Sequence, residues 1–263
     1  MSVILEAQNL TLAWHEDDFI VDGLNLEVCE GELVCLVGKS GMGKTTILHA
    51  LAGLLAPRAG QVLLRGEDIT GKPGHVSYML QKDLLLPNLR VVDNAALPLV
   101  LAGTAKSEAH DQALALLEHL GLSTVADAWP AQLSGGMRQR VAFARTYLQG
   151  NSVVLLDEPF SALDAITRTS LRTWFKRMVA ELGLSTLMIT HDPDEATLLA
   201  DRIYVLGKSE AHGTYSKIAG EIIPQHPSEA ASEDYTTSSG IPVHDYSLTP
   251  EFLETKSAIL SLL

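Results

Sequence analysis

A glycine-rich loop between an apolar run and a helix-favouring segment constrains this chain more than any other feature. Residues 38–45 read Gly-Lys-Ser-Gly-Met-Gly-Lys-Thr, with Leu33 to Val37 before them and Thr46 to Leu54 after them. The loop fits the phosphate-binding pattern G-x-x-x-x-G-K-[ST] without a mismatch. The alternative, a glycine-rich turn before an ordinary helix, is disfavoured because both flanking elements that the pattern needs are present. The chain is therefore predicted to bind a nucleoside triphosphate.

The pattern also assigns contacts within the loop. Its glycines let successive backbone N–H groups point at an anion, and the helix start adds the positive end of its dipole. Lys44 is predicted to reach the terminal phosphates, and the Thr45 hydroxyl to ligate Mg²⁺. The predicted nucleotide-binding residues of the loop are Gly38, Ser40, Gly41, Gly43, Lys44, Thr45 and Thr46.

Composition limits the class of protein. A chain of 263 residues that is 46% hydrophobic and 19% charged is long enough to bury a full α/β core. No apolar stretch reaches the roughly 18 residues that span a bilayer, and residues 1–6 lack a positive leader region, so neither spanning nor export is expected. Cys29 and Cys35 form no metal-binding motif and are expected to be reduced thiols in the cytosol. A net charge of −13 argues against a nucleic-acid partner.

Periodicity predicts a β-rich start and a helical middle. Alternating apolar residues predict antiparallel strands over residues 3–14 and 21–28, and further strands are expected near 60–64 and 75–80. Trp14 is a candidate to stack on an adenine ring, with a core tryptophan as the alternative. A helix is predicted from about Ser107, as its N-cap, to Leu120, with Gly121 after its end. Residues 84–150 are expected to form a helical subdomain.

Two further segments carry candidate chemistry. Ser134, Gly135 and Gly136 open a predicted helix and form either a second anion site or a simple N-cap. The apolar run from Val153 is typical of a buried parallel strand, and it ends in Asp157 and Glu158. In a phosphate-binding protein such an Asp holds the Mg²⁺ shell, and the next Glu polarises the attacking water. A structural acidic turn is the alternative.

The ordered set of motifs resembles the ATP-binding subunits of ABC transporters over about residues 2–207. The set comprises the loop at 38–45, Gln81, Leu133 to Gly136, Val153 to Glu158, Ser161 to Asp164, and Thr190 to Asp192. The resemblance implies an α/β fold, with a P-loop NTPase core, an antiparallel β subdomain and an inserted helical subdomain. It also implies ATP and Mg²⁺ as ligands, and an ATPase activity.

The resemblance implies roles for individual residues. Glu158 matches the catalytic base, His191 the histidine that senses the γ-phosphate, and Lys44 the phosphate-binding lysine. Asp157, Thr45 and Gln81 match the metal-site residues, while Asp164 and Ser134 to Gly136 match contacts to nucleotide. The family implies a head-to-tail dimer, in which two ATP molecules lie between the loop of one subunit and Ser134 of the other.

Three departures from the family pattern accompany this resemblance. Met137 stands where many members have Gln, and Ala162 lies within the Ser161–Asp164 motif. The base-stacking position is Trp14 rather than the more frequent Tyr, and Phe19 is an alternative stacking residue.

The segment from Tyr78 to Pro87 is similar to importers of the nitrate, sulfonate, taurine and pyrimidine-precursor group. This implies a second ATP-binding subunit, a separate membrane permease received by a groove at Leu84 to Leu101, and an external substrate-binding protein. The chain would then lie on the cytoplasmic side of the inner membrane. The rival interpretation is a soluble ABC-type ATPase that switches a non-transport partner. A single P-loop and the absence of heptads between Thr45 and Asp157 favour transport.

The remaining residues, 208–263, are predicted to be a C-terminal extension. Gly207 to Tyr246 is rich in small and polar residues and is expected to be weakly structured. Thr249 and Pro250 predict the N-cap and the first residue of a short final helix. Its predicted apolar face, which should dock on the body or on a partner, comprises Phe252, Leu253, Ile259, Leu260, Leu262 and Leu263.

Overall fold

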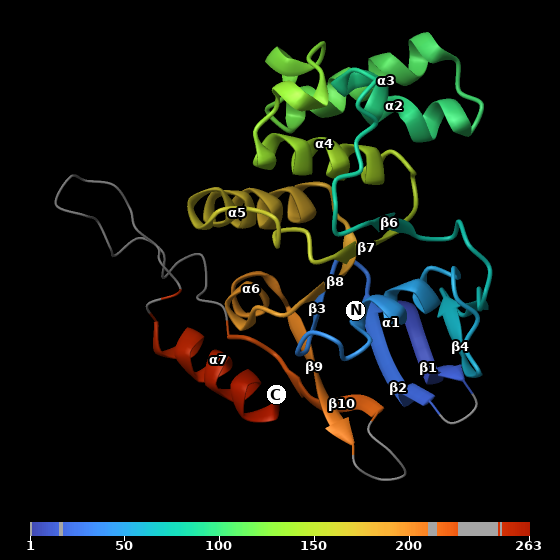
Figure 1. Ribbon diagram of the computed structural model, residues 1–263, viewed down its shortest axis with the longest axis vertical. Coiled ribbons are helices and arrows are strands. Elements are labelled where there is room, and N and C mark those ends of the chain that lie inside the picture. The colour runs from blue at the N-terminus through green and yellow to red at the C-terminus, as the bar shows by residue number, and fades with distance from the viewer. Residues whose placement is uncertain (1, 16–17, 210–214, 226–246, 248) are drawn as a thin grey trace, which may run out of the picture.

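A ten-stranded mixed sheet organises the computed structural model, which describes residues 2–15, 18–209, 215–225, 247 and 249–263 (Figure 1). The strand order is β5-β4-β1-β2-β10-β9-β3-β8-β7-β6. The strands are β1 (Val3–His15), β2 (Asp18–Cys29), β3 (Leu33–Val37), β4 (Ala59–Leu64), β5 (Glu67–Asp68), β6 (Ser77–Met79), β7 (Val153–Asp157), β8 (Ser185–Thr190), β9 (Arg202–Ser209) and β10 (Tyr215–Ile222). The α/β prediction is confirmed.

The sheet has a parallel part and an antiparallel part. Strands β9, β3, β8, β7 and β6 pair in parallel, whereas β1 pairs antiparallel with β2 and β4. Every residue of β3 is buried. Leu33, Cys35 and Val37 point into one core, and Val34 and Leu36 point into the other. A strand buried on both faces therefore leads into the glycine-rich loop.

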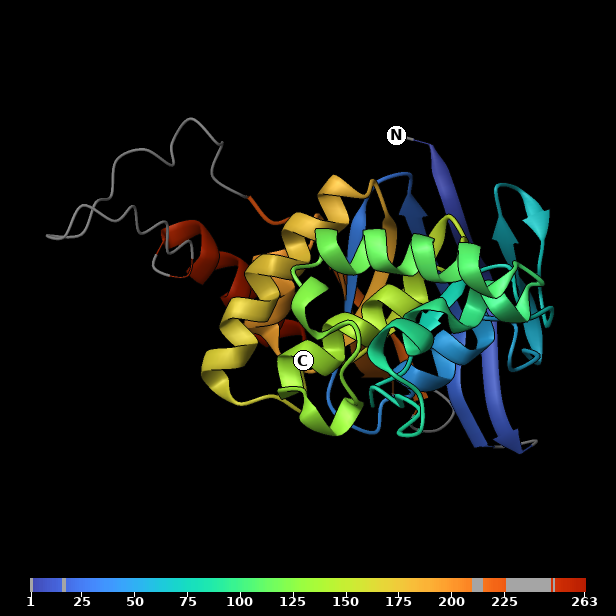
Figure 2. The same cartoon turned by 90° about the horizontal axis from the view of Figure 1, so that it is seen from above.

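Helices cover the sheet and form a separate layer above it. The α-helices are α1 (Lys44–Leu51), α2 (Val91–Leu101), α3 (Lys106–His119), α4 (Gly135–Tyr147), α5 (Ala165–Glu181), α6 (Pro193–Leu199) and α7 (Pro250–Leu262). Short 3-10 turns occupy Ser123–Val125 and Pro130–Gln132. Helices α2, α3 and α4 contact one another and stand together at the top of Figure 1, and Figure 2 shows them from above. They lie within the predicted helical subdomain.

Two local predictions in this layer met different outcomes. The predicted N-cap Ser107 is wrong, because α3 begins at Lys106 with Ala105 as N-cap and without a side-chain cap. Gly121 does follow the C-cap Leu120 with a positive φ of 72°, as predicted. Both cysteines are free and buried.

The predicted weakly structured segment from Gly207 is wrong as far as residue 222. Strand β9 runs through Gly207 to Ser209, and β10 pairs antiparallel with β9 and parallel with β2 at Ser216–Val21. A domain boundary at residue 207 therefore falls inside a strand of the central sheet. The rest of the predicted segment, 226–246, lies outside the described residues.

The final helix α7 starts as predicted. The Thr249 hydroxyl accepts a hydrogen bond from the Phe252 N–H at 3.3 Å, and Pro250 is the first helical residue. Phe252 and Ile259 are buried, but Leu253 and Leu260 are more than half exposed, so the predicted apolar face is only partly correct. Helix α7 docks on α6, β9 and β10.

Gly60→Ala should destabilise the fold far more than Gly66→Ala. Both glycines have a positive φ, 84° and 81° respectively, which costs an alanine about 1 kcal/mol. A Cβ on Gly60 would also lie 2.3 Å from the Asn9 carbonyl oxygen, whereas one on Gly66 meets nothing within 4 Å. Separating β1 from β4 should raise the total loss to about 3 kcal/mol or more. Equal losses for both variants in urea unfolding would contradict this explanation.

Candidate active site

The glycine-rich loop wraps around the start of α1. Gly41 and Gly43 adopt positive φ values of 81° and 83°, and Gly43 is the N-cap without any side-chain cap. A Cβ on Gly43 would lie 2.3 Å from the Ile20 Cγ2 atom, so any larger residue would have to displace that side chain of β2 as well as adopt a positive φ. The first N–H groups of the helix are left without a side-chain acceptor, which suits an anion.

The Lys44 ammonium is held inside this loop. Its Nζ donates to the Gly38 carbonyl at 2.7 Å and to the Lys39 carbonyl at 3.0 Å, and the residue is only 5% exposed. Burial lowers the Lys44 pKa, while the carboxylates of Glu158 and Asp157 raise it. Glu158 Oε1 lies 3.9 Å from Nζ. Lys44 is therefore a cation positioned by backbone oxygens at the point where phosphates would enter.

Asp157 ends the buried strand β7 and accepts two hydrogen bonds. The Thr45 hydroxyl donates to its Oδ1 and the Tyr78 hydroxyl to its Oδ2, each at 3.3 Å. Burial raises the pKa of Asp157, which these two hydrogen bonds oppose. Burial, with the neighbouring Asp157 carboxylate, raises the pKa of Tyr78.

The donor set suits Mg²⁺ bound together with a substrate. Within the described residues no group of three His, Cys, Asp or Glu side chains gathers to hold a metal alone. A hydroxyl and one carboxylate supply the hard oxygen ligands that Mg²⁺ takes when phosphates and water complete its shell. Thr45 and Asp157 would hold the ion. Thr45 and Gln81 line the same cavity, and Asp157 adjoins it through its hydrogen bond with Thr45.

Glu158 is the centre of a polar cluster. It has an uncommon positive φ of 42°, and its N–H donates to the Ile189 carbonyl of β8. Gln81 Nε2 donates to Glu158 Oε2 at 3.4 Å, and His191 Nδ1 lies 3.0 Å from the same oxygen. Three residues from distant parts of the chain thus meet at the carboxyl ends of β6, β7 and β8.

Glu158 and Gln81 border a cavity of about 620 Å³, which lies between the glycine-rich loop and the last residues of β1 and the first residues of β2. The predicted site residues that line it are Trp14, Ser40, Gly41, Gly43, Lys44, Thr45, Thr46, Gln81 and Glu158. Trp14 is 62% exposed, which removes the core alternative. Phe19 also lines the cavity, with the Arg58 guanidinium 5.4 Å from its ring centroid, so two aromatic residues remain candidates for stacking.

Sequence reasoning missed part of the lining. Asp18, Ile20, Met42, Lys208, Tyr215 and Ser216 also border the cavity. The last three come from the β9–β10 hairpin, whose polar composition gave no signal for a strand. Ser216 and Ile218 share the cavity-side face of β10, but a register shift after Ile218 turns Gly220 toward α7, so the alternation that marks a strand is short.

Several predicted residues lie outside this cavity. Ser134 is the N-cap of α4, and its hydroxyl accepts from the Met137 N–H at 3.2 Å. Asp164 is the N-cap of α5 and accepts from the Thr167 N–H at 3.0 Å, a contact that lowers its pKa. A Cβ on Gly136 would lie 3.0 Å from the Thr167 Cγ2 atom, so the two helix starts pack together. Asp157 and His191 touch the lining residues without being part of the lining.

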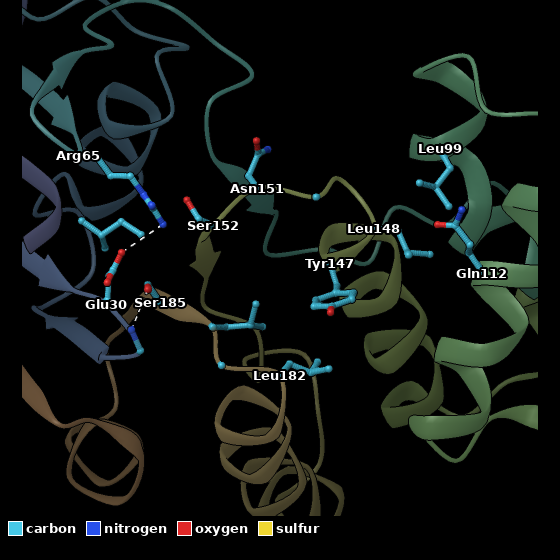
Figure 3. Close-up of a pocket in the computed structure, with 15 residues that line it drawn as sticks. Glu30, Arg65, Leu99, Gln112, Tyr147, Leu148, Asn151, Ser152, Leu182 and Ser185 are labelled. Atoms are coloured by element: carbon cyan, nitrogen blue, oxygen red, sulfur yellow. Dashed lines mark hydrogen bonds and ion pairs between the residues drawn. The ribbon is translucent and has the colours of Figure 1, made fainter. Parts of the chain in front are cut away.

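A second cavity of about 520 Å³ lies where β7 and β8 begin (Figure 3). The Glu30–Arg65 ion pair, at 3.2 Å, stands on one side, and Gln112 and Leu99 of the helical layer stand on the other. None of the predicted site residues lines it.

The family model described as ABC transporter matches residues 21–161, more than half of the chain. The chain belongs to the ABC transporter family. It is similar to the formylaminopyrimidine import ATP-binding protein ThiZ of Halalkalibacterium halodurans, with 36% identity over 80% of this chain and 82% of ThiZ. It is 43% identical to the aliphatic sulfonates import protein SsuB of Delftia acidovorans, over 79% of this chain and 82% of SsuB. Similarity to a sulfate/thiosulfate import protein CysA 2 of Shewanella oneidensis, at 41% identity, spans 78% of this chain but only 60% of CysA 2.

Solved structures agree with this assignment. The ATP-binding cassette MJ0796, a dimer bound to ADP and Pi, matches with a TM-score of 0.70 and 27% identity over 85% of this chain and 100% of that one. The cassette MJ1267 shares the fold, with a TM-score of 0.74 and 23% identity over 85% of this chain and 92% of that one. As a member of the ABC transporter family, the present chain is an ATPase. Within the described residues no helix has the length and hydrophobicity to cross a membrane.

Asp157→Asn should stabilise the nucleotide-free cassette at neutral pH and abolish ATP hydrolysis. Folding raises the Asp157 pKa, so the folded state favours the neutral carboxyl. The penalty is absent below the unfolded pKa and appears as pH rises through the folded pKa. The Thr45 and Tyr78 hydroxyls can each accept as well as donate, so the amide keeps partners. The expected rise in melting temperature is about 2 °C or more at pH 7.

The stability difference between this variant and the parent should shrink as pH falls toward about 4. Asp111→Asn, on the exposed face of α3, is the matched control and should change neither quantity. A lower melting temperature for Asp157→Asn at pH 7 would contradict the burial penalty.

Proposed function

We propose that this chain is the ATP-hydrolysing subunit of an importer and powers uptake of a small solute through a separate permease. The observation that carries the proposal is the meeting of Lys44, Asp157, Glu158 and His191 beside one cavity, in a chain similar to import proteins over four fifths of its length. Mg²⁺ bound with ATP would neutralise phosphate charge at Thr45 and Asp157.

In the proposed reaction, water attacks the γ-phosphate in line with the leaving oxygen. Lys44 binds the phosphate oxygens on which charge grows, and its fixed position keeps the reorganisation cost low. The Glu158 carboxylate orients the water and accepts its proton. His191 and Gln81 hold that carboxylate through the hydrogen bonds described above, and His191 can donate to a phosphate oxygen.

The site is proposed to be completed by a second ATP-binding subunit, an identical copy in the simplest arrangement. The N-terminus of α4, formed by Ser134, Gly135 and Gly136, suits an anion. It does not border the ATP cavity of its own chain. A head-to-tail dimer places this N-terminus over the partner's nucleotide, with Asp164 beside it, and satisfies both sites at once. ATP then stabilises the closed pair, and hydrolysis releases it.

Glu158→Gln should lower the ATPase rate by about a hundredfold or more and trap an ATP-bound dimer. The amide keeps the hydrogen bonds but cannot accept the proton of the attacking water. Size-exclusion chromatography with ATP should show the dimer. Glu181→Gln, at the exposed end of α5, is the control and should hydrolyse at the parent rate. Hydrolysis at the parent rate by Glu158→Gln would contradict the assigned role.

The permease is proposed to dock at the segment from Leu84 to Leu101. Four apolar side chains of this segment, Leu84, Leu86, Val100 and Leu101, are exposed, and Leu101 is 79% exposed. The backbone that precedes α2 is well anchored, because Arg145 donates to the carbonyls of Asp83 and Leu84 and Asn94 binds the carbonyl and N–H of Leu86. Gln81, three residues before this segment, lines the ATP cavity, so the proposed docking site follows the cavity directly in sequence.

Purification from native membranes should recover this chain with a multi-span permease and, once the complex is intact, a substrate-binding protein whose ligand names the solute. Leu101→Asp should leave the ATPase activity of the isolated subunit unchanged and reduce permease recovery. Leu253→Asp, on the exposed side of α7, should not reduce it. Recovery of soluble partners alone would overturn the transport role and leave the ATPase assignment intact.

A further inference from the structure

One wall of the ATP cavity comes from a hairpin that the sequence motifs do not include. Lys208, Tyr215 and Ser216 line the cavity together with the glycine-rich loop at residues 38–45, the P-loop. Lys208 lies in β9, opposite Ser216 of β10, and Ser216 pairs in turn with Val21 of β2. The hairpin therefore lies between β3, which leads into the glycine-rich loop, and β2, whose Ile20 side chain packs against Gly43.

The β9 backbone is fixed directly against the start of the P-loop. Val205 pairs with Val37, the last residue of β3. A Cβ on Gly38 would lie 3.0 Å from the Leu206 Cβ, which shows how closely β9 approaches the loop. Successive side chains of a strand alternate between its faces, so Lys208 shares the face of Leu206. That face is the one toward the loop.

The opposite face of the hairpin is occupied by the C-terminal helix. A Cβ on Gly207 would lie 3.4 Å from the Leu262 carbonyl oxygen, and one on Gly220 would lie 2.6 Å from the Leu262 Cδ1 atom. Helix α7 thus seats on the glycines and backs the hairpin from behind. Lys208 is held on a supported strand, with its side chain exposed on the cavity side.

The charge of Lys208 is available to a ligand. The charged residues that line the cavity are Asp18, Lys44, Glu158 and Lys208. Lys44 is already bound by two carbonyls and lies near Glu158. Within the described part of the chain no carboxylate lies within 4.0 Å of the Lys208 ammonium. The net charge of the chain is −13, yet this positive charge lies beside the phosphate-binding loop. It complements the negative charge of a polyphosphate.

We propose that Lys208 is a further nucleotide-binding residue, whose ammonium contacts the phosphate chain of bound ATP from the β9–β10 side. This inference rests on the proposed nucleotide site at residues 38–45. The flexible four-carbon stem lets the Lys208 ammonium contact the phosphate chain of either ATP or ADP. Lys44, by contrast, is held in one position by two backbone carbonyls. The β9–β10 hairpin then belongs to the ATP site.

The test is calorimetric titration of the full chain with MgADP and with the slowly hydrolysed analogue ATPγS. Lys208→Ala should weaken both affinities about three- to tenfold, the scale of a partly exposed charge contact. Lys208→Arg should restore most of the affinity. The loss should shrink as NaCl rises from about 0.05 M to about 0.5 M, because salt screens an exposed charge.

Lys217→Ala is the matched control. Lys217 is an exposed lysine of the same hairpin, it pairs with Gly207 on the face away from the cavity, and it does not line the cavity. Parent-like affinity of Lys208→Ala, or an equal loss in Lys217→Ala, would overturn the proposal. A loss insensitive to salt would also overturn it.

Lys44→Ala separates this inference from the site on which it rests. If Lys44→Ala weakens binding strongly and Lys208→Ala does not, the P-loop site stands and the role of Lys208 fails. If Lys44→Ala binds both nucleotides like the parent, the proposed site itself fails. Unchanged melting temperatures of the Lys208 and Lys217 variants would show that their comparison reports binding rather than folding.

Discussion

The buried Lys44 ammonium is the interaction on which the rest of the structure depends. Removing such a cation from water is costly unless oxygen atoms replace its hydration shell. The Gly38 and Lys39 carbonyls do so, which requires the loop to curl, and Gly41 and Gly43 permit that curl. The carboxylates at the end of β7 complete the environment. The parallel sheet is what brings loop and carboxylates together, because the carboxyl ends of its strands share one edge.

A second network fixes the segment that carries His191. Arg172 of α5 lies 2.7 Å from the Asp192 carboxylate and 2.6 Å from that of Glu195, and it is 12% exposed. The Thr190 hydroxyl donates to Glu195 at 2.5 Å. These buried contacts surround His191 on both sides in sequence and leave its ring half exposed. The ring can therefore change partners while contacts on both sides hold its backbone, which suits the phosphate contact proposed for it.

The sequence predicted the parts of the molecule in which local chemistry and tertiary structure agree. The P-loop, the buried strand β7 and the caps at Ser134 and Thr249 each follow from the properties of a few adjacent residues. Strand β10 was missed because its partners β2 and β9 decide its structure, while its own Lys217 and Glu221 remain exposed. The N-cap of α3 is Ala105 and not the predicted Ser107. A helix can begin without a side-chain cap when water hydrogen-bonds the free N–H groups of an exposed first turn. Both Trp14 and Phe19 remain candidates for stacking on a base, because their positions in the sequence do not give the position of the base.

The position of β3 in the strand order has a consequence for how the chain is made. All five of its buried residues pair with β8 on one side, and Val34 to Val37 pair with β9 on the other. Both partner strands follow about 150 to 165 residues later in the chain. At typical rates of protein synthesis, about ten to thirty seconds separate the appearance of β3 from that of its partners. During this interval an apolar strand leaves the ribosome ahead of both strands that will pair with its edges, although β1, β2 and α1 are already available to cover the face of Val34 and Leu36. The strand that leads into the site is thus a part of the nascent chain whose two edges stay open to wrong pairing until β8 and β9 are made.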